Sequence, residues 1–274
     1  MSDYLVTGKK GNGKTLVCVA RIREALRRGA PVATNLDLNL DKLLPYGNRS
    51  ARVIRLPDKP TRADLDAIGS AYDGRYDEKR FGCLVLDELA TWLNARTFQD
   101  RDRQGVLEWL AHSRKLHWDT YLIAQHPNQI DKQIREAMAE FHVICRRADR
   151  IRIPFVGLKP PRLHIAYVRY GVDQHALLSD RWIYRGNDLF DAYDTEQVFR
   201  SDYPHAIHSV LPPGYWAPTK SQRSFFASLI AFLRREKSPK RALKPKLPAV
   251  AALSGLPADL AFTEARRLIL AGLV

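Results

Sequence analysis

The sequence is poor in cysteine, with three among 274 residues, at positions 18, 83 and 145, and no CxxC pair. Without paired cysteines, a structural zinc site or a dithiol redox centre is not expected. The cysteines lie in largely apolar stretches, so we predict three small buried side chains in a reducing compartment. The eight histidines show no HExxH spacing, which argues against a helix-borne zinc hydrolase site.

Long apolar runs are also missing. The longest candidate is Ser224–Leu233, which ends at two arginines. A helix of that length would be about 15 Å long, half of the roughly 30 Å hydrocarbon layer. We therefore expect this segment to lie in a membrane interface or on a partner, and not to span a bilayer alone. The N-terminal residues do not have the form of a signal peptide.

Acidic residues are outnumbered: 44 Lys and Arg face 30 Asp and Glu, for a net charge of +14. An excess of this size favours a polyanionic partner, either a nucleic acid or an anionic membrane surface. The length allows one large domain with a core, or one domain with a smaller appendage.

The N-terminal stretch YLVTGKKGNGKT predicts a strand at 4–7, a glycine loop, and a helix from Thr15 onward. Gly8-x-x-x-x-Gly13-Lys14-Thr15 is the P-loop pattern in its strand-to-helix context. Its main-chain amides and the helix N-terminus suit a phosphate, Lys14 suits the β/γ-phosphate charge, and the Thr15 hydroxyl suits Mg²⁺. The expected nucleotide-binding residues are Gly8, Lys9, Lys10, Gly11, Asn12, Gly13, Lys14 and Thr15. The alternative is a plain glycine turn.

A second stretch, FGCLVLDELATWLNAR, contains a buried-strand pattern over 83–86 that ends in Asp87 and Glu88. An acid at the carboxyl end of a strand in an open α/β sheet lies near the bound ligand. We predict that Asp87 supports Mg²⁺ and that Glu88 orients and polarises the attacking water, which favours an ATPase over a phosphotransferase. The alternative is an acidic pair that caps a helix at 89–94.

The third stretch predicts a helix over 107–115 and a strand over 119–124 that ends in Gln125. A glutamine at this position can contact the γ-phosphate and the attacking water. The alternative is a hydrogen-bonded polar residue at a strand end. Asp131 then begins a helix as its N-cap, and FHVICRR at 141–147 forms a further strand.

These stretches together resemble the Zonula occludens toxin (Zot) family, the assembly ATPases of filamentous bacteriophages. The similarity covers roughly residues 3–200 and includes TGKKGNGKT, PVATNLDL, LVLDE, HSRKLHWDTYLIAQHPNQID and YRGNDLFDAYDT. The resemblance implies a P-loop ATPase that drives extrusion of single-stranded phage DNA through the host inner membrane. Its ligands would be ATP and Mg²⁺, and its partners the DNA or its protein complex and the phage coat and channel proteins.

The resemblance also implies candidate arginines. Arg114 matches a basic position between the two strands, and Arg96 matches an arginine after the acidic pair. Either could reach the nucleotide of a neighbouring subunit as an arginine finger, which implies a homo-oligomer, such as a ring. The alternative for each is a surface arginine. Family members carry a membrane-spanning helix after the ATPase domain, for which this sequence offers only residues 224–233.

The remaining segments are less specific. Residues 58–80 predict one short helix, and 146–170 two strands joined by a turn, which extend the sheet or form a hairpin. Aromatic and arginine residues in 181–195 could stack on bases, or simply pack a strand. Residues 201–218 are proline-rich and predict a loop at a domain edge. Residues 219–246 carry nine Lys and Arg against one Glu, as a solvated linker or a polyanion-binding arm, and 247–274 predict two short helices.

The sequence therefore predicts an α/β protein: a three-layer P-loop NTPase domain at 1–200 with a mostly parallel sheet, a basic linker or membrane-surface arm at 201–246, and a small helical tail at 247–274. We expect an ATPase in the host cytoplasm, peripheral to the inner membrane. Two alternatives stay open: a scaffold that binds nucleotide without turnover, and a P-loop nucleotide kinase.

Overall fold

The computed structural model describes residues 2–93, 101–130, 132, 135, 139–147, 163–173, 176–185 and 189–216. They belong to one compact unit, Met1–Thr219. Several predicted features lie outside the described residues: Arg96, Asp131, the turn between the two strands of 146–170, the basic arm at 219–246 and the helical tail.

A nine-stranded sheet runs through this unit in the order β8-β7-β6-β1-β5-β4-β2-β3-β9. Its six central strands, from β6 to β3, are parallel, and antiparallel strands extend both edges. The predicted mostly parallel sheet is confirmed. The strands are β1 (Asp3–Thr7), β2 (Val32–Thr34), β3 (Val53–Arg55), β4 (Gly82–Leu86), β5 (Trp118–Ile123), β6 (Phe141–Arg147), β7 (Leu163–Tyr170), β8 (Leu178–Arg185) and β9 (His208–Val210).

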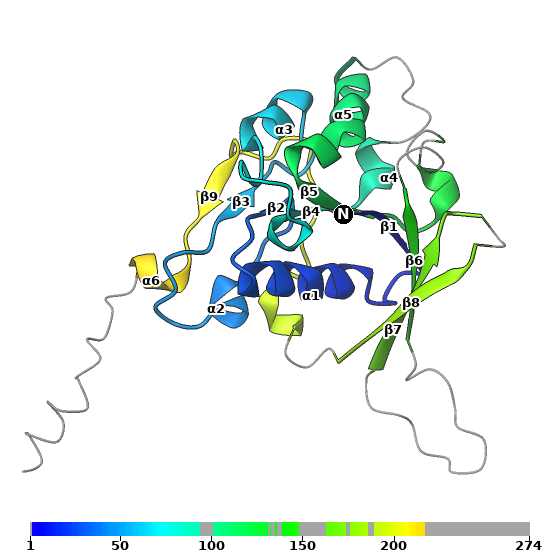
Figure 1. The fold of residues 1–274 in the computed structure, drawn as a ribbon, viewed down its shortest axis with the longest axis horizontal. Helices are drawn as coiled ribbons and strands as arrows, with labels where there is room; N and C mark the ends of the chain where they lie inside the picture. The colour runs from blue at the N-terminus through cyan, green and yellow to red at the C-terminus, as the bar shows by residue number, and fades with distance from the viewer. Residues whose placement is uncertain are drawn as a thin grey trace, which may run out of the picture. The chain divides into compact units, whose positions relative to one another are not determined.

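Helices cover both faces of the sheet, so the fold has three layers (Figure 1). Helix α1 (Lys14–Arg27) lies on one face, and α3 (Arg62–Ile68), α4 (Leu89–Trp92) and α5 (Arg101–His112) lie on the other. The two apolar layers follow from this arrangement, one built around α1 and one around α3, α4 and α5. The shorter elements are α2 (Leu40–Leu43), α6 (Pro213–Trp216), η1 (Glu78–Arg80), η2 (Ser113–Leu116), η3 (Pro127–Gln129) and η6 (Phe190–Ala192).

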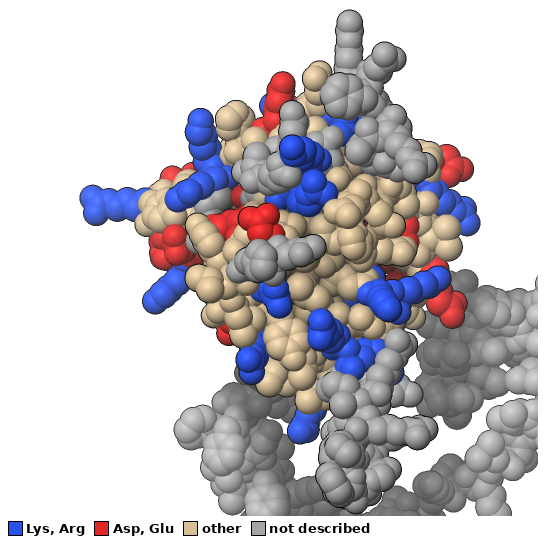
Figure 2. Space-filling view, turned by 90° about the vertical axis from the view of Figure 1, so that its right-hand side faces the viewer, with Lys and Arg blue, Asp and Glu red and all other residues tan. Residues whose placement is uncertain are grey.

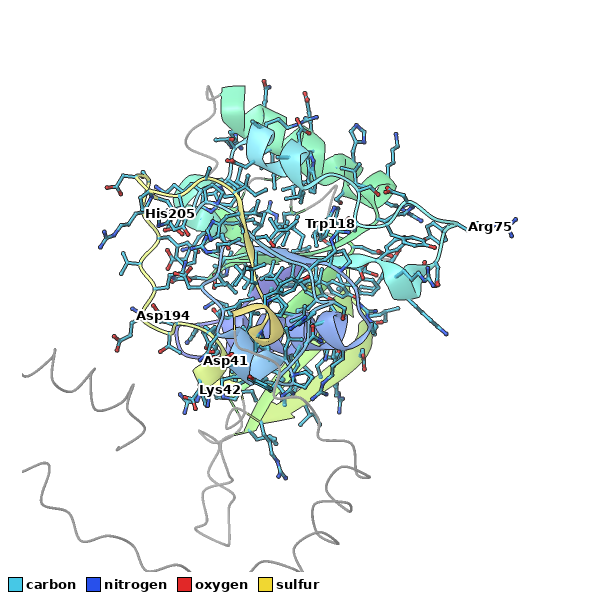
Figure 3. The ribbon with its side chains drawn as sticks, turned by 90° about the vertical axis from the view of Figure 1, so that its left-hand side faces the viewer. Asp41, Lys42, Arg75, Trp118, Asp194 and His205 are labelled. Carbon is cyan, nitrogen blue, oxygen red and sulfur yellow. The ribbon has the colours of Figure 1, made fainter. Side chains whose placement is uncertain are left out.

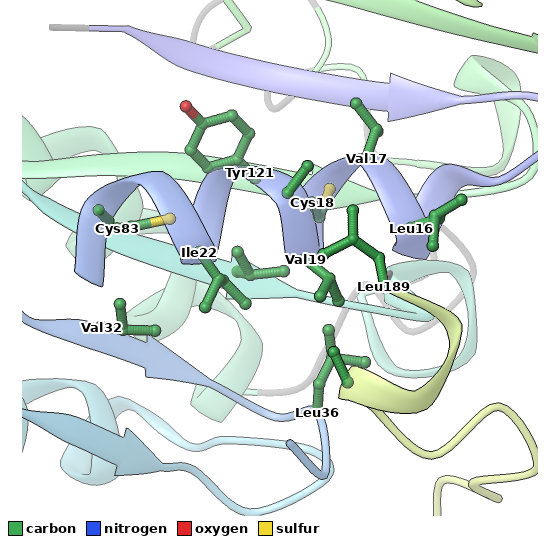
Figure 4. Packing of buried hydrophobic residues seen from close by; sticks show 14 of the residues in the cluster. Leu16, Val17, Cys18, Val19, Ile22, Val32, Leu36, Cys83, Tyr121 and Leu189 are labelled. Carbon is green, nitrogen blue, oxygen red and sulfur yellow. The ribbon is translucent and has the colours of Figure 1, made fainter. Parts of the chain in front are cut away.

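The apolar side chains of α1 explain why this helix docks behind the P-loop. Leu16, Val19 and Ile22 are fully buried, and they pack with side chains of β2, β4 and β5 (Figure 4). Each such side chain contributes about 1.5–3 kcal/mol on burial. The helix is therefore fixed by its core face, and its N-terminus is held at the carboxyl edge of the sheet. The three cysteines are buried as predicted.

Sequence and structure differ at two element boundaries. The helix predicted over 107–115 begins at Arg101 and ends at His112, after which the chain tightens into η2. The stretch predicted as a loop at 201–218 includes β9, which pairs with the edge strand β3. The sheet therefore continues beyond residue 200. A three-residue strand among prolines has no apolar alternation, so its pattern did not indicate it.

Two other predictions can be compared with the described residues. Residues 58–80 contain the predicted short helix as α3, whose start is fixed by a capping box between Thr61 and Asp64, and they end in the 3-10 turn η1. The strand predicted at 141–147 is β6. Of the two strands predicted in 146–170, the second is β7, which pairs antiparallel with β6 and extends the sheet, and the first falls outside the described residues. Among the described residues, the helices are all too short or too polar to cross a bilayer.

Candidate functional site

The P-loop connects β1 to α1 and takes a backbone path that depends on glycine. Gly8, Gly11 and Gly13 have φ values of 148°, 77° and 83°. A Cβ atom on Gly13 would lie 2.5 Å from Nδ1 of His164, and one on Gly8 would lie 2.8 Å from the carbonyl oxygen of Cys145. The loop therefore needs glycine at both of these positions for conformation and for space.

Side chains from β7 and β8 brace the loop from behind. The Tyr184 hydroxyl donates to the carbonyl oxygen of Gly13 at 3.1 Å, and its ring stacks on that of His164 with centroids 5.4 Å apart. The Asn12 side chain donates to the carbonyl of Cys145 at 3.1 Å. Sequence reasoning missed Tyr184 and His164. The stretch 181–195, which contains Tyr184, indicated only strand packing or base stacking, and 146–170, which contains His164, indicated only strands. Strand packing is what the structure shows for Trp182, whose ring lies against Tyr4.

Asp87 is held beside the P-loop by hydrogen bonds on both sides. The Thr15 hydroxyl donates to Asp87 Oδ2 at 2.7 Å. The buried Asn35 side chain accepts from the Asp87 amide at 2.8 Å and donates to the Asp87 carbonyl at 3.1 Å. Burial raises the pKa of Asp87, while Thr15 and Lys14 act in the opposite direction. Asn35 was missed as a site residue, although a polar residue directly after a buried strand is the same signal that identified Gln125.

Glu88 sits in a strained backbone conformation at the mouth of the site. Its φ and ψ are 53° and 36°, the left-handed region that costs a residue with a Cβ about 1–2 kcal/mol. The Glu88 amide donates to Asp87 Oδ1 at 2.6 Å, which holds the turn. Its side chain is exposed and lines the same cleft as Lys14. Strain of this kind at a cleft is typical of functional residues.

Gln125 lies between the P-loop and the acidic pair because of the strand order. β5 is inserted between β1 and β4, so the residue that follows β5 comes out between the two loops. The Gly8 amide donates to the carbonyl oxygen of Gln125 at 3.3 Å, and the residue lines the cleft with Asp87 and Glu88. The structure thus brings Gln125 to the place that the sequence predicted.

Arg114 lies elsewhere. It is exposed in η2, which precedes β5, and it interacts with the side chain of Tyr76. β5 has six residues. At a rise of about 3.3 Å per residue, it separates this end of the sheet from the P-loop end by about 20 Å. Figure 3 shows Arg75, the neighbour of Tyr76, and the cleft residue Asp194 on opposite sides of the molecule. Within one subunit Arg114 is therefore remote from the cleft.

The cleft has a volume of about 450 Å³. Lys10, Gly11, Gly13, Lys14 and Thr15 line it, whereas Gly8, Lys9 and Asn12 belong to the loop but not to the cleft wall. The opposite wall comes from a segment that sequence reasoning did not assign to the site: Tyr193, Asp194, Thr195, Gln197 and Phe199.

Hydrogen bonds fasten this segment to the loop after β2. The Gln197 side chain donates to the carbonyl of Asn35 at 2.9 Å, and the Asp194 amide donates to the carbonyl of Asp37 at 2.9 Å. Burial raises the pKa of Tyr193 to about 12, so its hydroxyl stays protonated at neutral pH. The wall and the Asp87 side of the cleft therefore share Asn35 as a common support.

The donor set fits a magnesium ion. Mg²⁺ prefers oxygen ligands and retains several waters. Thr15 and Asp87 bring a hydroxyl and a carboxylate oxygen within 2.7 Å of each other at the cleft. Thr15 and Asp87 are therefore the residues that would hold the ion.

Comparison with known proteins shows the family of this chain. The sequence profile of the family described as Zonular occludens toxin (Zot) matches residues 2–177. The chain belongs to the Zot family. This Zot-family chain is 45% identical over 225 residues to the Gene 1 protein of Enterobacteria phage M13 and 46% identical over 225 residues to that of Escherichia phage If1. Each alignment covers 78% of this chain and 64% of the relative, so the chain spans less than two thirds of these relatives.

Among solved structures, the N-terminal domain of zonular occludens toxin from Neisseria meningitidis is similar to this Zot-family chain. It superposes with a TM-score of 0.43 at 15% sequence identity, over 70% of this chain and 98% of that domain.

Proposed function

We propose that this Zot-family chain binds ATP with Mg²⁺ in the cleft beside the P-loop and hydrolyses it. The observation that carries the proposal is the convergence of four groups on one cleft: the P-loop with Lys14, the Thr15–Asp87 contact, Glu88, and Gln125. Each group has a separate task in phosphoryl transfer to water.

In this proposal the loop amides and Lys14 hold the phosphates and neutralise their charge. Thr15 and Asp87 would hold the metal, which would supply positive charge to the phosphate oxygens. Glu88 accepts a proton from the attacking water, and its exposed carboxylate is held at the cleft by the turn that Asp87 fixes. Gln125 orients the water and contacts the γ-phosphate from between the two loops.

The work that hydrolysis drives is inferred from the family. We propose that this chain powers assembly and extrusion of filamentous phage single-stranded DNA through the host inner membrane, as a homo-oligomeric ring with the coat and channel proteins as partners. The surplus of positive charge agrees with a polyanionic partner. Arg114 is remote from the cleft of its own subunit, so a role as an arginine finger requires the nucleotide of a neighbouring subunit. Arg96 is the other candidate for that role.

The test uses two variants of the cleft and an inert control. Lys14→Ala should abolish uptake of a fluorescent ATP analogue, since the phosphates lose their cation. Glu88→Gln should retain uptake and lower phosphate release by about 100-fold or more, the usual loss with a general base. Lys42→Ala, in α2, should match wild type.

Three results would contradict the assignment in different ways. Failure of the wild-type protein to take up ATP with Mg²⁺ would remove the site altogether. Normal assembly with Glu88→Gln would favour the nucleotide-gated scaffold. Transfer of the γ-phosphate to a second nucleotide would favour the kinase.

A further inference from the structure

A second cleft lies beside the P-loop, on the side away from the acidic pair. Its volume is about 680 Å³. Its walls come from the end of β1 with Gly8 and Lys9, from the segment that follows β5, and from β6 and β7. The proposed ATP chemistry uses none of the side chains that β6 and β7 contribute to this cleft.

The cleft is strongly basic. Lys9, Arg135, Arg146 and Arg169 line it, against the single acid Asp173. The four cations come from four separate segments of the chain, so they are not neighbours on one surface helix. The face formed by β6–β8 carries Lys and Arg side chains at several places (Figure 2).

Hydrogen bonds and ring contacts position two of these arginines. Arg135 Nη1 donates to Oδ1 of Asn128, which lies in η3 after β5, at 3.0 Å. The Arg146 guanidinium lies 5.8 Å from the centroid of the Tyr167 ring, on the neighbouring strand. Guanidinium groups held in this way are suited to phosphate oxygens, since their planar set of donors is already oriented.

A buried histidine, His142, also lines the cleft. His142 accepts or donates one hydrogen bond, to the Thr7 hydroxyl at 2.7 Å. Burial lowers its pKa to about 4, and Arg169 and His126 add to the effect. His142 therefore stays neutral at pH 7 and adds no charge of its own to the cleft.

We propose that this basic cleft binds the phosphodiester backbone of single-stranded DNA and that Gln125, which lines both clefts, connects bound DNA to the nucleotide site. The inference rests on the proposed function for the identity of the polymer. Cations spread over four segments suit a run of phosphates better than one small anion. Gln125 is the physical link, because its carbonyl accepts from the P-loop amide of Gly8 at 3.3 Å.

The experiment measures binding of a labelled oligo(dT) to the full chain as a function of NaCl. The variants are Arg146→Ala, Arg169→Ala and the double variant, with Arg27→Ala as the control. Arg27 is an exposed arginine on the last turn of α1, beside a different cleft at the other end of the helix. Lys14→Ala is measured in parallel, and every variant is also tested for uptake of fluorescent ATP.

Each lost phosphate contact should lower the slope of log K against log[NaCl] by about 0.7 for a single strand. At about 0.1 M salt this corresponds to a loss of about fivefold in affinity per contact and about 25-fold for the double variant. Arg27→Ala should keep the wild-type slope, and the double variant should keep its ATP affinity. Because Arg146 is exposed, its truncation does not threaten the fold.

An unchanged slope in the double variant, or an equal loss with Arg27→Ala, would overturn the assignment. Inorganic phosphate or AMP that competes as well as oligo(dT) at equal phosphate concentration would also overturn it, in favour of a small-anion site. ATP binding that survives Lys14→Ala would instead count against the proposed ATP site and leave the DNA cleft standing. The two failures are therefore distinguishable.

Discussion

Replacing Gly13 by alanine tests why the P-loop requires glycine at this position. Gly13 has φ 83°, and a Cβ there would lie 2.5 Å from the ring of the buried His164. Gly29, at the end of α1, has a similar φ of 76°, but a Cβ there would meet nothing within 4 Å. The two glycines therefore share the conformational requirement and differ in available space.

The magnitudes follow from that difference. A left-handed alanine costs about 1 kcal/mol, so Gly29→Ala should lower the free energy of unfolding by about that amount. Gly13→Ala should add an overpacking cost of about 1–3 kcal/mol, because the histidine ring must move. The total for Gly13→Ala is then about 2–4 kcal/mol. ATP uptake should fall at least tenfold with Gly13→Ala and be unchanged with Gly29→Ala.

Urea unfolding followed by circular dichroism measures the stability, with a constant m value as the condition for comparing midpoints. A double-mutant cycle with His164→Ala separates the cost of the left-handed backbone from the cost of the steric clash with the histidine ring. In the His164→Ala background, Gly13→Ala should cost only about 1 kcal/mol, as at Gly29. Equal costs at positions 13 and 29 in the wild-type background would refute the steric reasoning, and so would a coupling energy of zero in the cycle.

Three further predictions concern charge and backbone strain. Burial raises the pKa of Asp3 to about 6, so the free energy of unfolding decreases as pH rises from about 4 to 6. In urea titrations, Asp3→Asn should raise the free energy of unfolding by about 1–3 kcal/mol at pH 7 and leave it unchanged at pH 4. The pKa of His142 is lowered to about 4, so the free energy of unfolding decreases as pH falls from about 6.5 to 4. Between pH 7 and 4, the free energy of unfolding of His142→Gln should decrease by about 3 kcal/mol less than that of wild type, as measured by urea titrations. Glu88→Asn should match or exceed wild-type stability by up to about 1 kcal/mol, since asparagine tolerates the left-handed region, yet release phosphate at least about 100-fold more slowly.

The parts of the site that sequence predicted are those with a strong local pattern. The P-loop has fixed glycine and lysine spacing, and Asp87 and Gln125 each follow a buried apolar run that is typical of a strand. Each is recognisable from its immediate neighbours alone, and parallel strand ends meet at one edge of a sheet.

The missed residues depend on contacts over long sequence separations. Tyr184 braces Gly13 across 171 positions, and Gln197 reaches Asn35 across 162. Nothing in the local pattern of either residue distinguishes it from ordinary packing. Arg114 was predicted as a candidate arginine finger for a neighbouring subunit. It lies far from the cleft of its own subunit because β5, a strand of six residues, carries the chain from one edge of the sheet to the other.

The position of β5 also explains how two clefts can share one residue. If β1 and β4 were adjacent, the residue after β5 would have no access to the space between the P-loop and the acidic pair. Because β5 is inserted there, Gln125 faces the Asp87 side of the P-loop, and the chain that follows it, from His126 to Asn128, forms a wall of the basic cleft on the other side. Gln125 directly precedes His126 in the chain, so in the proposed coupling a ligand that shifts this short segment also displaces Gln125. Strand order therefore supplies the mechanical connection on which the proposed coupling between DNA and nucleotide depends.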